Sequence, residues 1–265
     1  VLGDLWVVSR NPFILDDLLQ NPKRRVSLIH ALHHRLEQII ARADKNPQAI
    51  ALVNAAQTAI RNFEDEFDKE QALRRKTQQR LSRITRADNI DFGGLAKVSH
   101  VTDASDWRVE YPFVVLTPDS EAEMAKVVHA CVELGLGIIP RGGGTGYTGG
   151  AVPLKKHCAV INTEKLDAIG TATMRRIDDI DRDVPTIHVE AGVVTRRVSE
   201  AAEANGFVFA VDPTSQDASC IGGNIAINAG GKKAVLWGTP LANLRSWRRV
   251  MHACPWSEVQ PRQSK

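Results

Sequence analysis

The sequence predicts an α+β protein, in which a helical N-terminal extension over residues 1–100 precedes a second domain over residues 101–265. Apolar residues recur at helical spacing in the first part. In the second part, short apolar runs typical of strands alternate with helical patterns, as in βαβ folds. Two glycine-rich segments, 140–150 and 221–231, interrupt this alternation and allow close approach of the backbone to a ligand.

Two amphipathic runs define the helical extension. The first run contains Leu28, Leu32, Leu36, Ile39 and Ala43, and the second contains Val53, Ala56, Ile60, Phe63 and Phe67. Asn46-Pro47 separates them, so we expect an antiparallel helix pair. From Lys69 to Asp88, seven basic residues stand against two acidic ones. No aromatic residues interleave with these charges, which favours a solvated helix face over a nucleic-acid contact.

The composition argues against several classes of protein. A net charge of +3 is too small to indicate a nucleic-acid partner. Four cysteines form no C-x-x-C pair, and His30, His33 and His34 lack a carboxylate or cysteine at matching spacing, so we expect no metal site. No apolar run is long enough to span a bilayer, and no signal peptide is recognised. We expect a cytoplasmic protein, with peripheral contact to the inner face of a membrane as the alternative.

The α/β elements follow in a regular order after the helical extension. We expect strands over Tyr111–Leu116, Leu136–Ile139, Cys158–Asn162 and Thr186–Glu190, and helices over Pro118–Leu134 and Val194–Asn205. Ser120 and Glu123 form a capping-box pattern, and Gly206 closes the second helix. The strand-helix-strand order predicts a right-handed βαβ unit whose next loop lies at the carboxyl edge of the sheet.

That loop, the first glycine segment, reads P-R-G-G-G-T-G-Y-T-G-G from Pro140 to Gly150. Six of the nine residues from Gly142 onward are glycine, which suits a backbone nest for phosphate. A P-loop is excluded, because the first lysine, Lys155, stands behind a proline. The spacing G-x-G-x-x-G is present, but a strand follows it instead of the long helix of a nicotinamide fold. We therefore expect loop backbone to hold the phosphates.

These segments together resemble the vanillyl-alcohol oxidase and PCMH-type flavoproteins, in particular the D-lactate dehydrogenase and glycolate oxidase branch. The resemblance rests on T-D-A-S at Thr102–Ser105, the first glycine segment, Val189–Val193, and Asp212–Gly231 with its I-G-G-N and N-A-G-G. It implies a PCMH-type FAD-binding domain of two small α/β subdomains. The helical extension is similar to that of a branch in which iron–sulfur modules are fused to the flavin domain.

The resemblance implies FAD as the cofactor and a set of residues that hold it. The expected cofactor-binding residues are Pro140, Arg141, Gly142, Gly143, Gly144, Thr145, Gly146, Pro213, Thr214, Ser215, Ser219, Gly222, Gly223, Asn224 and Ile227. Arg141 is read either as a counter-charge for the pyrophosphate or as a surface arginine. Some members attach flavin covalently through a histidine where this chain has Thr145, so we expect non-covalent FAD. We expect Cys220 to be a small residue that serves only in packing.

The implied activity is FAD-dependent oxidation of the CH–OH group of a 2-hydroxy acid of the D-lactate or glycolate type. Its implied partners are that acid and an electron acceptor: a quinone, a cytochrome or a fused iron–sulfur module. Members of the family carry catalytic residues in a cap and C-terminal segment, whereas this chain ends in what reads as a polar tail, Cys254–Pro261. We assign no catalytic residue. Because no such cap is recognised in the sequence, the alternative is a truncated flavin-binding fragment without activity of its own; the initial Val1 also suits an unusual start or a fragment.

Overall fold

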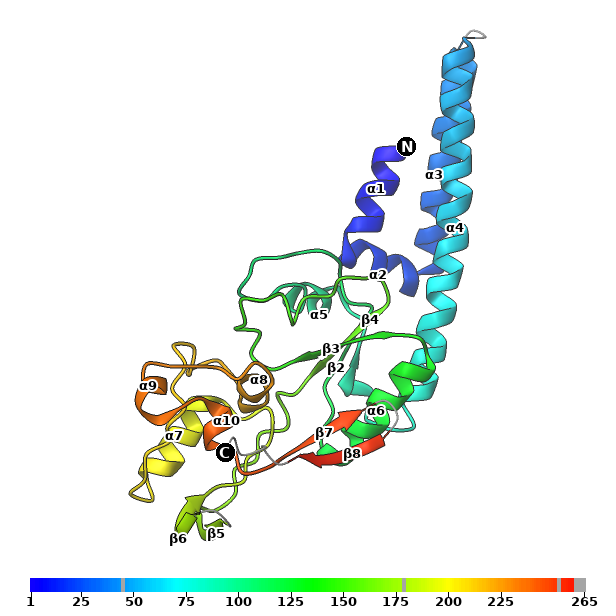
Figure 1. The fold of residues 1–265 in the computed structure, drawn as a ribbon. Helices are drawn as coiled ribbons and strands as arrows, with labels where there is room; N and C mark the ends of the chain where they lie inside the picture. The colour runs from blue at the N-terminus through cyan, green and yellow to red at the C-terminus, as the bar shows by residue number, and fades with distance from the viewer. Residues whose placement is uncertain (44–45, 178–179, 252–253, 260–265) are drawn as a thin grey trace. The chain divides into compact units, whose positions relative to one another are not determined.

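A computed structural model describes residues 1–43, 46–177, 180–251 and 254–259 of the chain (Figure 1). The chain divides into two compact units. The helical unit comprises Val1–Ser82 and Phe92–Ser99, and the α/β unit comprises Arg83–Asp91 and the chain from His100 onward. The chain therefore passes between the units three times.

The helical unit contains α1 (Leu2–Arg10), α2 (Pro12–Gln20), α3 (Pro22–Arg42), α4 (Pro47–Leu81) and α5 (Gly94–Ser99). Proline opens α2, α3 and α4, where its missing N–H needs no partner. Asn11 and Asn46 cap α2 and α4: each side-chain oxygen accepts hydrogen bonds from two backbone N–H groups of the first turn. Proline and asparagine thus set the helix boundaries.

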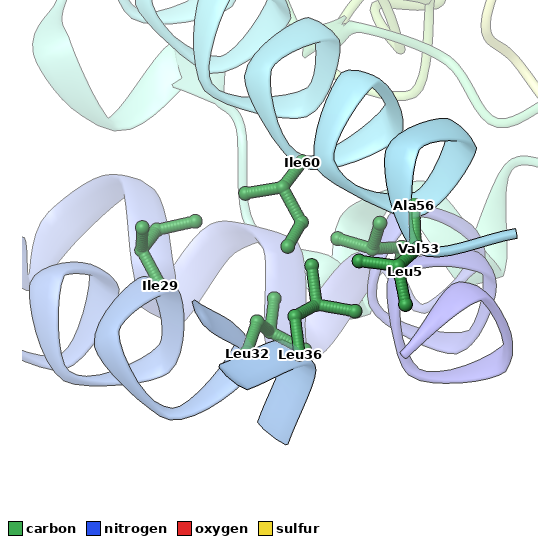
Figure 2. Close-up of a cluster of buried hydrophobic side chains, with 7 residues drawn as sticks. All are labelled: Leu5, Ile29, Leu32, Leu36, Val53, Ala56 and Ile60. Carbon is green, nitrogen blue, oxygen red and sulfur yellow. The ribbon is translucent and has the colours of Figure 1, made fainter. Parts of the chain in front are cut away.

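The core of the helical unit confirms the predicted pairing of two amphipathic helices. Leu5, Ile29, Leu32, Leu36, Val53, Ala56 and Ile60 form one buried cluster, seen in Figure 2. The helices α3 and α4 pack side by side and are joined by a short connection, which makes them antiparallel (Figure 1). Ile39 lies in α3, as its spacing predicts, but it is 45% exposed and does not belong to the core.

Most of the basic segment Lys69–Asp88 lies in the last part of α4, and its Arg75 and Lys76 are exposed, as predicted. Arg74 departs from that prediction. Its guanidinium lies 2.6 Å from the Asp16 carboxylate and 4.8 Å from the centre of the Phe92 ring. It therefore joins α4 to α2 and to the segment before α5, as a partly buried packing residue.

The α/β unit contains a four-stranded sheet in the order β1-β2-β4-β3. Its strands are β1 (Ile90–Asp91), β2 (Val114–Leu116), β3 (Gly137–Arg141) and β4 (Cys158–Asn162). The last three run parallel, and β1 is antiparallel to β2. α6 (Glu121–Glu133) joins β2 to β3, and the Ser120 side chain accepts a hydrogen bond from the Glu123 N–H, as the capping pattern predicts.

The rest of this unit differs from the prediction in two places. Val189 makes only an isolated bridge to Ile169, so the strand expected over Thr186–Glu190 was wrong. A hairpin precedes it instead, made of β5 (Thr173–Ile177) and β6 (Ile180–Thr186). The expected polar tail was also wrong in part, because β8 (Cys254–Val259) pairs with β7 (Trp247–Met251); positions 260 and 261 lie outside the described residues.

Short helices complete the α/β unit. α7 (Thr195–Glu203) confirms the predicted helix, and the left-handed Gly206 follows its end with φ of 76°. The other helices are α8 (Ile221–Ala226), α9 (Ala234–Trp237), α10 (Pro240–Asn243) and the 3-10 turn η1 (Ala87–Asn89). Across the described part of the chain, no helix combines the length and apolar character needed to cross a membrane.

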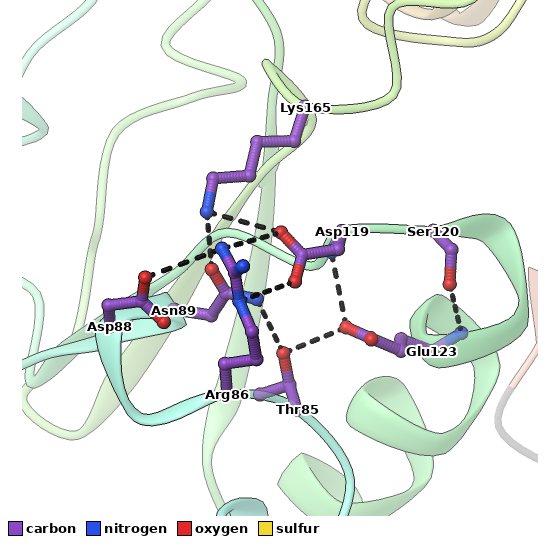
Figure 3. A network of polar contacts seen from close by, with 8 residues as sticks. All are labelled: Thr85, Arg86, Asp88, Asn89, Asp119, Ser120, Glu123 and Lys165. Carbon is purple, nitrogen blue, oxygen red and sulfur yellow. Dashed lines mark hydrogen bonds and ion pairs between the residues drawn. The ribbon is translucent and has the colours of Figure 1, made fainter.

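A polar network fixes the Arg83–Asp91 segment within the α/β unit (Figure 3). The buried Asn89 donates to the Thr85 hydroxyl at 2.7 Å and accepts from the Lys165 ammonium. Asp119 lies 3.2 Å from Lys165 and 3.0 Å from Arg86. The network therefore joins η1 to the loops that follow β2 and β4, at the carboxyl edge of the sheet.

Candidate functional site

The first glycine segment leaves the carboxyl end of β3 in the parallel sheet. The Thr163 N–H, just after β4, donates to the Arg141 carbonyl at 2.9 Å and ties down the start of the loop. Gly144 and Gly149 adopt left-handed φ values of 65° and 71°, which other residues rarely adopt. The backbone conformation of the loop therefore requires glycine at these two positions, with or without a ligand.

The loop contains backbone donors that the protein does not use. Within the described residues, the N–H groups of Gly144, Thr145 and Gly146 donate no hydrogen bond, although all three residues are only half-exposed. Unused N–H groups in a glycine loop form a concave site for an anion. This is the property that a pyrophosphate requires.

The first glycine segment is in contact with the residues that lead into the second. A Cβ atom added at Gly143 would lie 1.9 Å from the Ala218 carbonyl oxygen, and one at Gly142 would lie 3.0 Å from the Cys220 Cβ. A side chain at Gly143 would require the backbone opposite to move, whereas one at Gly142 would press on the Cys220 side chain. The residues just before the second glycine segment (Ile221–Gly231) therefore pack directly on the first.

Two further close contacts continue this packing. A Cβ at Gly192 would lie 1.8 Å from the Thr163 carbonyl oxygen, and one at Gly222 would lie 2.8 Å from the Ala191 Cβ. The Gly222 N–H donates to the Ala191 carbonyl at 2.9 Å. The turn at Ala191-Gly192 therefore lies between the residues after β4 and the start of α8.

Ser219 and Asn224 belong to a buried hydrogen-bond network with Thr195, a residue that the sequence analysis missed. The Asn224 amide donates to the Thr195 hydroxyl at 2.6 Å, and the Ser219 and Thr195 hydroxyls are 2.9 Å apart. All three residues are buried. Thr195 opens α7 beyond the predicted strand and turn, and no local sequence signal links it to residues more than twenty positions away.

The Arg141 side chain contacts backbone carbonyls outside the first glycine segment. Its Nη1 donates to the Thr102 carbonyl at 2.7 Å and to the Ala151 carbonyl at 3.5 Å. Burial lowers the pKa of this guanidinium, while the nearby Asp103 carboxylate acts in the opposite direction. Arg141 is half-buried, so the structure differs from the description of a surface arginine.

The remaining expected residues differ in exposure. Pro140 lies in β3, and Pro213 is buried. Ser215 is half-exposed, whereas Thr214 and Ile227 are exposed. No atom lies within 4 Å of a Cβ added at Gly146 or Gly223, so the protein itself leaves open space in front of these two glycines.

Two buried cysteines, Cys131 and Cys220, carry protonated thiols. Burial raises the pKa of the Cys220 thiol, and burial raises the pKa of the Cys131 thiol to about 12, so both stay protonated at neutral pH. No group of three or more His, Cys, Asp or Glu side chains in the described ranges could hold a metal ion.

This surface fits FAD by three separate observations. Unused N–H groups in the first glycine segment suit the pyrophosphate. Open space at Gly146 and Gly223 allows a ligand to approach the backbone. Buried Ser219 and Asn224 give α8 a fixed position beside the loop. A cofactor with phosphates and a flavin ring needs anion-binding groups and a fixed surface on which the protein can orient it.

Family models match both parts of the chain. The model described as FAD binding domain matches residues 112–253, which is more than half of the chain. The model described as Protein of unknown function (DUF3683) matches residues 1–65.

Among curated proteins, the chain is similar to the glycolate oxidase subunit GlcD of Bacillus subtilis (strain 168), with 27% identity over 63% of this chain and 33% of that protein. It is 34% identical to a D-lactate dehydrogenase of Archaeoglobus fulgidus, over 50% of this chain and 27% of that protein. The chain thus spans about a third or less of the length of these relatives.

Among solved structures, the chain is similar to an alkyldihydroxyacetonephosphate synthase, with a TM-score of 0.61 and 19% identity. The similarity covers 71% of this chain and 34% of that one. At this identity the likeness concerns the fold, which is that of PCMH-type FAD-binding proteins, as the sequence predicted.

Proposed function

The chain belongs to the FAD binding domain family, and from that premise we propose that it is the FAD-binding part of an oxidoreductase that acts on a 2-hydroxy acid. FAD is the cofactor of this domain. Two relatives are a glycolate oxidase subunit and a D-lactate dehydrogenase, which supports glycolate or D-lactate as the type of substrate. The single observation that carries the binding site is the set of unused N–H groups at Gly144, Thr145 and Gly146.

When bound, FAD supplies a two-electron acceptor for the CH–OH group of the substrate. In our proposal, the backbone N–H groups of Gly144, Thr145 and Gly146 bind the pyrophosphate without covalent attachment. Gly222 and Gly223, with Ser219 and Asn224 beneath them, line the flavin or its ribityl chain.

Pro213, Thr214, Ser215 and Ile227 border the approach to the flavin in the same proposal. We name no residue of the chain as the acceptor of the substrate proton. For the whole protein, we propose that electrons pass from the flavin to a quinone, a cytochrome or an iron–sulfur module.

A second candidate is that residues 1–265 bind FAD but have no oxidase or dehydrogenase activity by themselves. The fact that favours it is the limited share of the relatives that the chain spans. The two candidates predict the same flavin content and differ in turnover.

The test is to express the intact protein and residues 1–265 separately and to record flavin absorbance before and after anaerobic addition of glycolate or D-lactate. The leading proposal predicts bound FAD in the intact protein and bleaching of its visible flavin absorbance by the substrate. If the substrate bleaches the flavin of the intact protein but not that of residues 1–265, the second candidate is favoured. A folded intact protein without flavin contradicts both.

A further inference from the structure

Arg141 lies where three backbone segments meet beneath the first glycine segment. Its Nη1 donates to the carbonyls of Thr102 and Ala151, which precede and follow the loop in the fold. The Ala104 N–H donates to the Gly144 carbonyl at 3.1 Å, so the Thr102–Ser105 segment also holds the loop directly. A Cβ at Gly144 would lie 2.4 Å from Nη2 of Arg141, so the guanidinium packs directly against the loop backbone.

Asp103 supplies the matching negative charge. The residue is only 6% exposed, and its Oδ1 accepts hydrogen bonds from the backbone N–H and the hydroxyl of Ser105. Its Oδ2 is buried without a hydrogen-bond partner among the described residues. Burial would raise the pKa of Asp103, but the hydrogen bonds from Ser105 lower it overall, so the group is a carboxylate at neutral pH.

We propose that Arg141 and Asp103 are a positioning pair that holds the first glycine segment in its phosphate-binding shape, and that Arg141 is not itself a phosphate ligand. This inference rests on the proposed function, because the shape matters for FAD. It departs from the counter-charge role that the sequence suggested for Arg141. Nη1 of the guanidinium donates to two backbone carbonyls, and the charge of the nearby buried Asp103 carboxylate is opposite to its own.

The chemistry of the pair explains the choice of side chains. A planar guanidinium presents several donors in fixed directions and can bridge two carbonyls, whereas an ammonium is a compact point charge. A carboxylate near a phosphate site disfavours anion binding by simple Coulomb repulsion. Its presence is therefore better explained by its effect on Arg141 and on the loop than by any direct effect on FAD.

The test uses three variants of the intact protein: Arg141→Lys, Arg141→Gln and Asp103→Asn. Arg197→Gln is the matched control, because the exposed Arg197 side chain forms an ion pair with the exposed Asp167 in the same unit. The first readout is the Kd of FAD for each apoprotein, measured by the change in flavin fluorescence on binding. The second is amide hydrogen exchange of residues 142–150 in the absence of FAD, normalised to exchange in β4.

The positioning pair predicts that both Arg141 variants and Asp103→Asn raise the Kd of FAD by about tenfold or more, which is about 1.4 kcal/mol. It also predicts faster exchange in 142–150 for all three, with β4 and the control unchanged. A direct phosphate contact predicts the reverse for two variants. Arg141→Lys would then stay within about threefold of the wild type, since lysine binds phosphate well, and Asp103→Asn would bind FAD more tightly.

Either of those two results, with unchanged exchange in the loop, overturns the inference. A variant that fails to fold is replaced by Ser105→Ala, which removes one hydrogen bond from Asp103 and is expected to speed exchange in the loop more weakly. If the wild-type protein binds no FAD, the proposed function fails. The exchange data still decide whether the pair holds the loop.

Discussion

The core of the helical unit and the glycine contacts of the α/β unit are built in opposite ways. In the helical unit, Leu32, Leu36 and Ile60 fill the space between helices with their side chains. In the α/β unit, Gly143 and Gly192 bring backbone against backbone because they have no side chain. The first region should therefore be sensitive to removal of volume, and the second to its addition.

The largest expected effect comes from truncation in the helical core. Leu32→Ala should lower the free energy of unfolding of the helical unit by about 2 to 5 kcal/mol, because the buried cluster loses contacts and gains a cavity. Leu32→Met, which conserves volume, should cost less than about 1.5 kcal/mol. Urea unfolding followed by circular dichroism measures both. Equal losses would mean that side-chain packing does not hold this unit together.

The next effect comes from adding one methyl group to the α/β unit. Gly192→Ala places a Cβ 1.8 Å from the Thr163 carbonyl oxygen, so backbone must move. We expect a loss of about 3 kcal/mol in the stability of that unit, the upper part of the usual range for overpacking. Gly230→Ala meets no atom within 4 Å and is the control. Indistinguishable thermal unfolding of the two variants would argue against the close contact.

A matched pair in α8 sharpens the comparison further. Gly222→Ala meets the Ala191 Cβ at 2.8 Å, and we expect it to destabilise the α/β unit by about 1 to 2 kcal/mol. Gly223→Ala meets nothing, and since alanine favours a helix over glycine it should be neutral or stabilising by up to about 1 kcal/mol. Differential scanning calorimetry of the apoproteins checks the order, which a reversal would contradict.

The smallest effect concerns the polar network around Asp119. Its hydrogen bond with Asn89, and then its contacts with Lys165 and Arg86, keep the pKa of Asp119 below the ordinary value. The folded state therefore binds this proton less readily than the unfolded state. The resulting stability is present at neutral pH and is lost as the pH falls below about 4.

Asp119→Asn should remove that contribution. The variant should be slightly less stable than the wild type at pH 7, with the difference shrinking at pH 3 in urea-unfolding experiments. A difference that stays constant over this range would show that Asp119 acts without its charge.

The regions that could be predicted are those whose pattern is local. The continuous apolar run Cys158–Asn162 gave β4 with the observed bounds, and helical spacing gave α3 and α4. The hairpin of β5 and β6 was missed because its residues are rich in Arg and Asp and show no apolar alternation. Its strands are set by pairing with each other, which periodicity does not reveal.

For the candidate site, the positions at which glycine is required could be predicted from the sequence, but only one of the two reasons for it could. We expected the glycines to face a ligand, yet Gly143 and Gly222 are also required by contacts with Ala218 and Ala191. Those partners lie tens of residues away in the chain. For the same reason the sequence did not reveal that Thr195 supports Ser219 and Asn224. Contacts between distant segments depend on the fold.

The central claim is that the two glycine segments form one surface that binds FAD at Gly146 and Gly223, where a Cβ atom would meet open space. The most direct measurement is FAD titration of the intact apoprotein carrying Gly146→Ala and Gly223→Ala together. We predict a Kd raised by at least about tenfold, or about 1.4 kcal/mol, with no loss of thermal stability. An unchanged Kd in the double variant would contradict the claim.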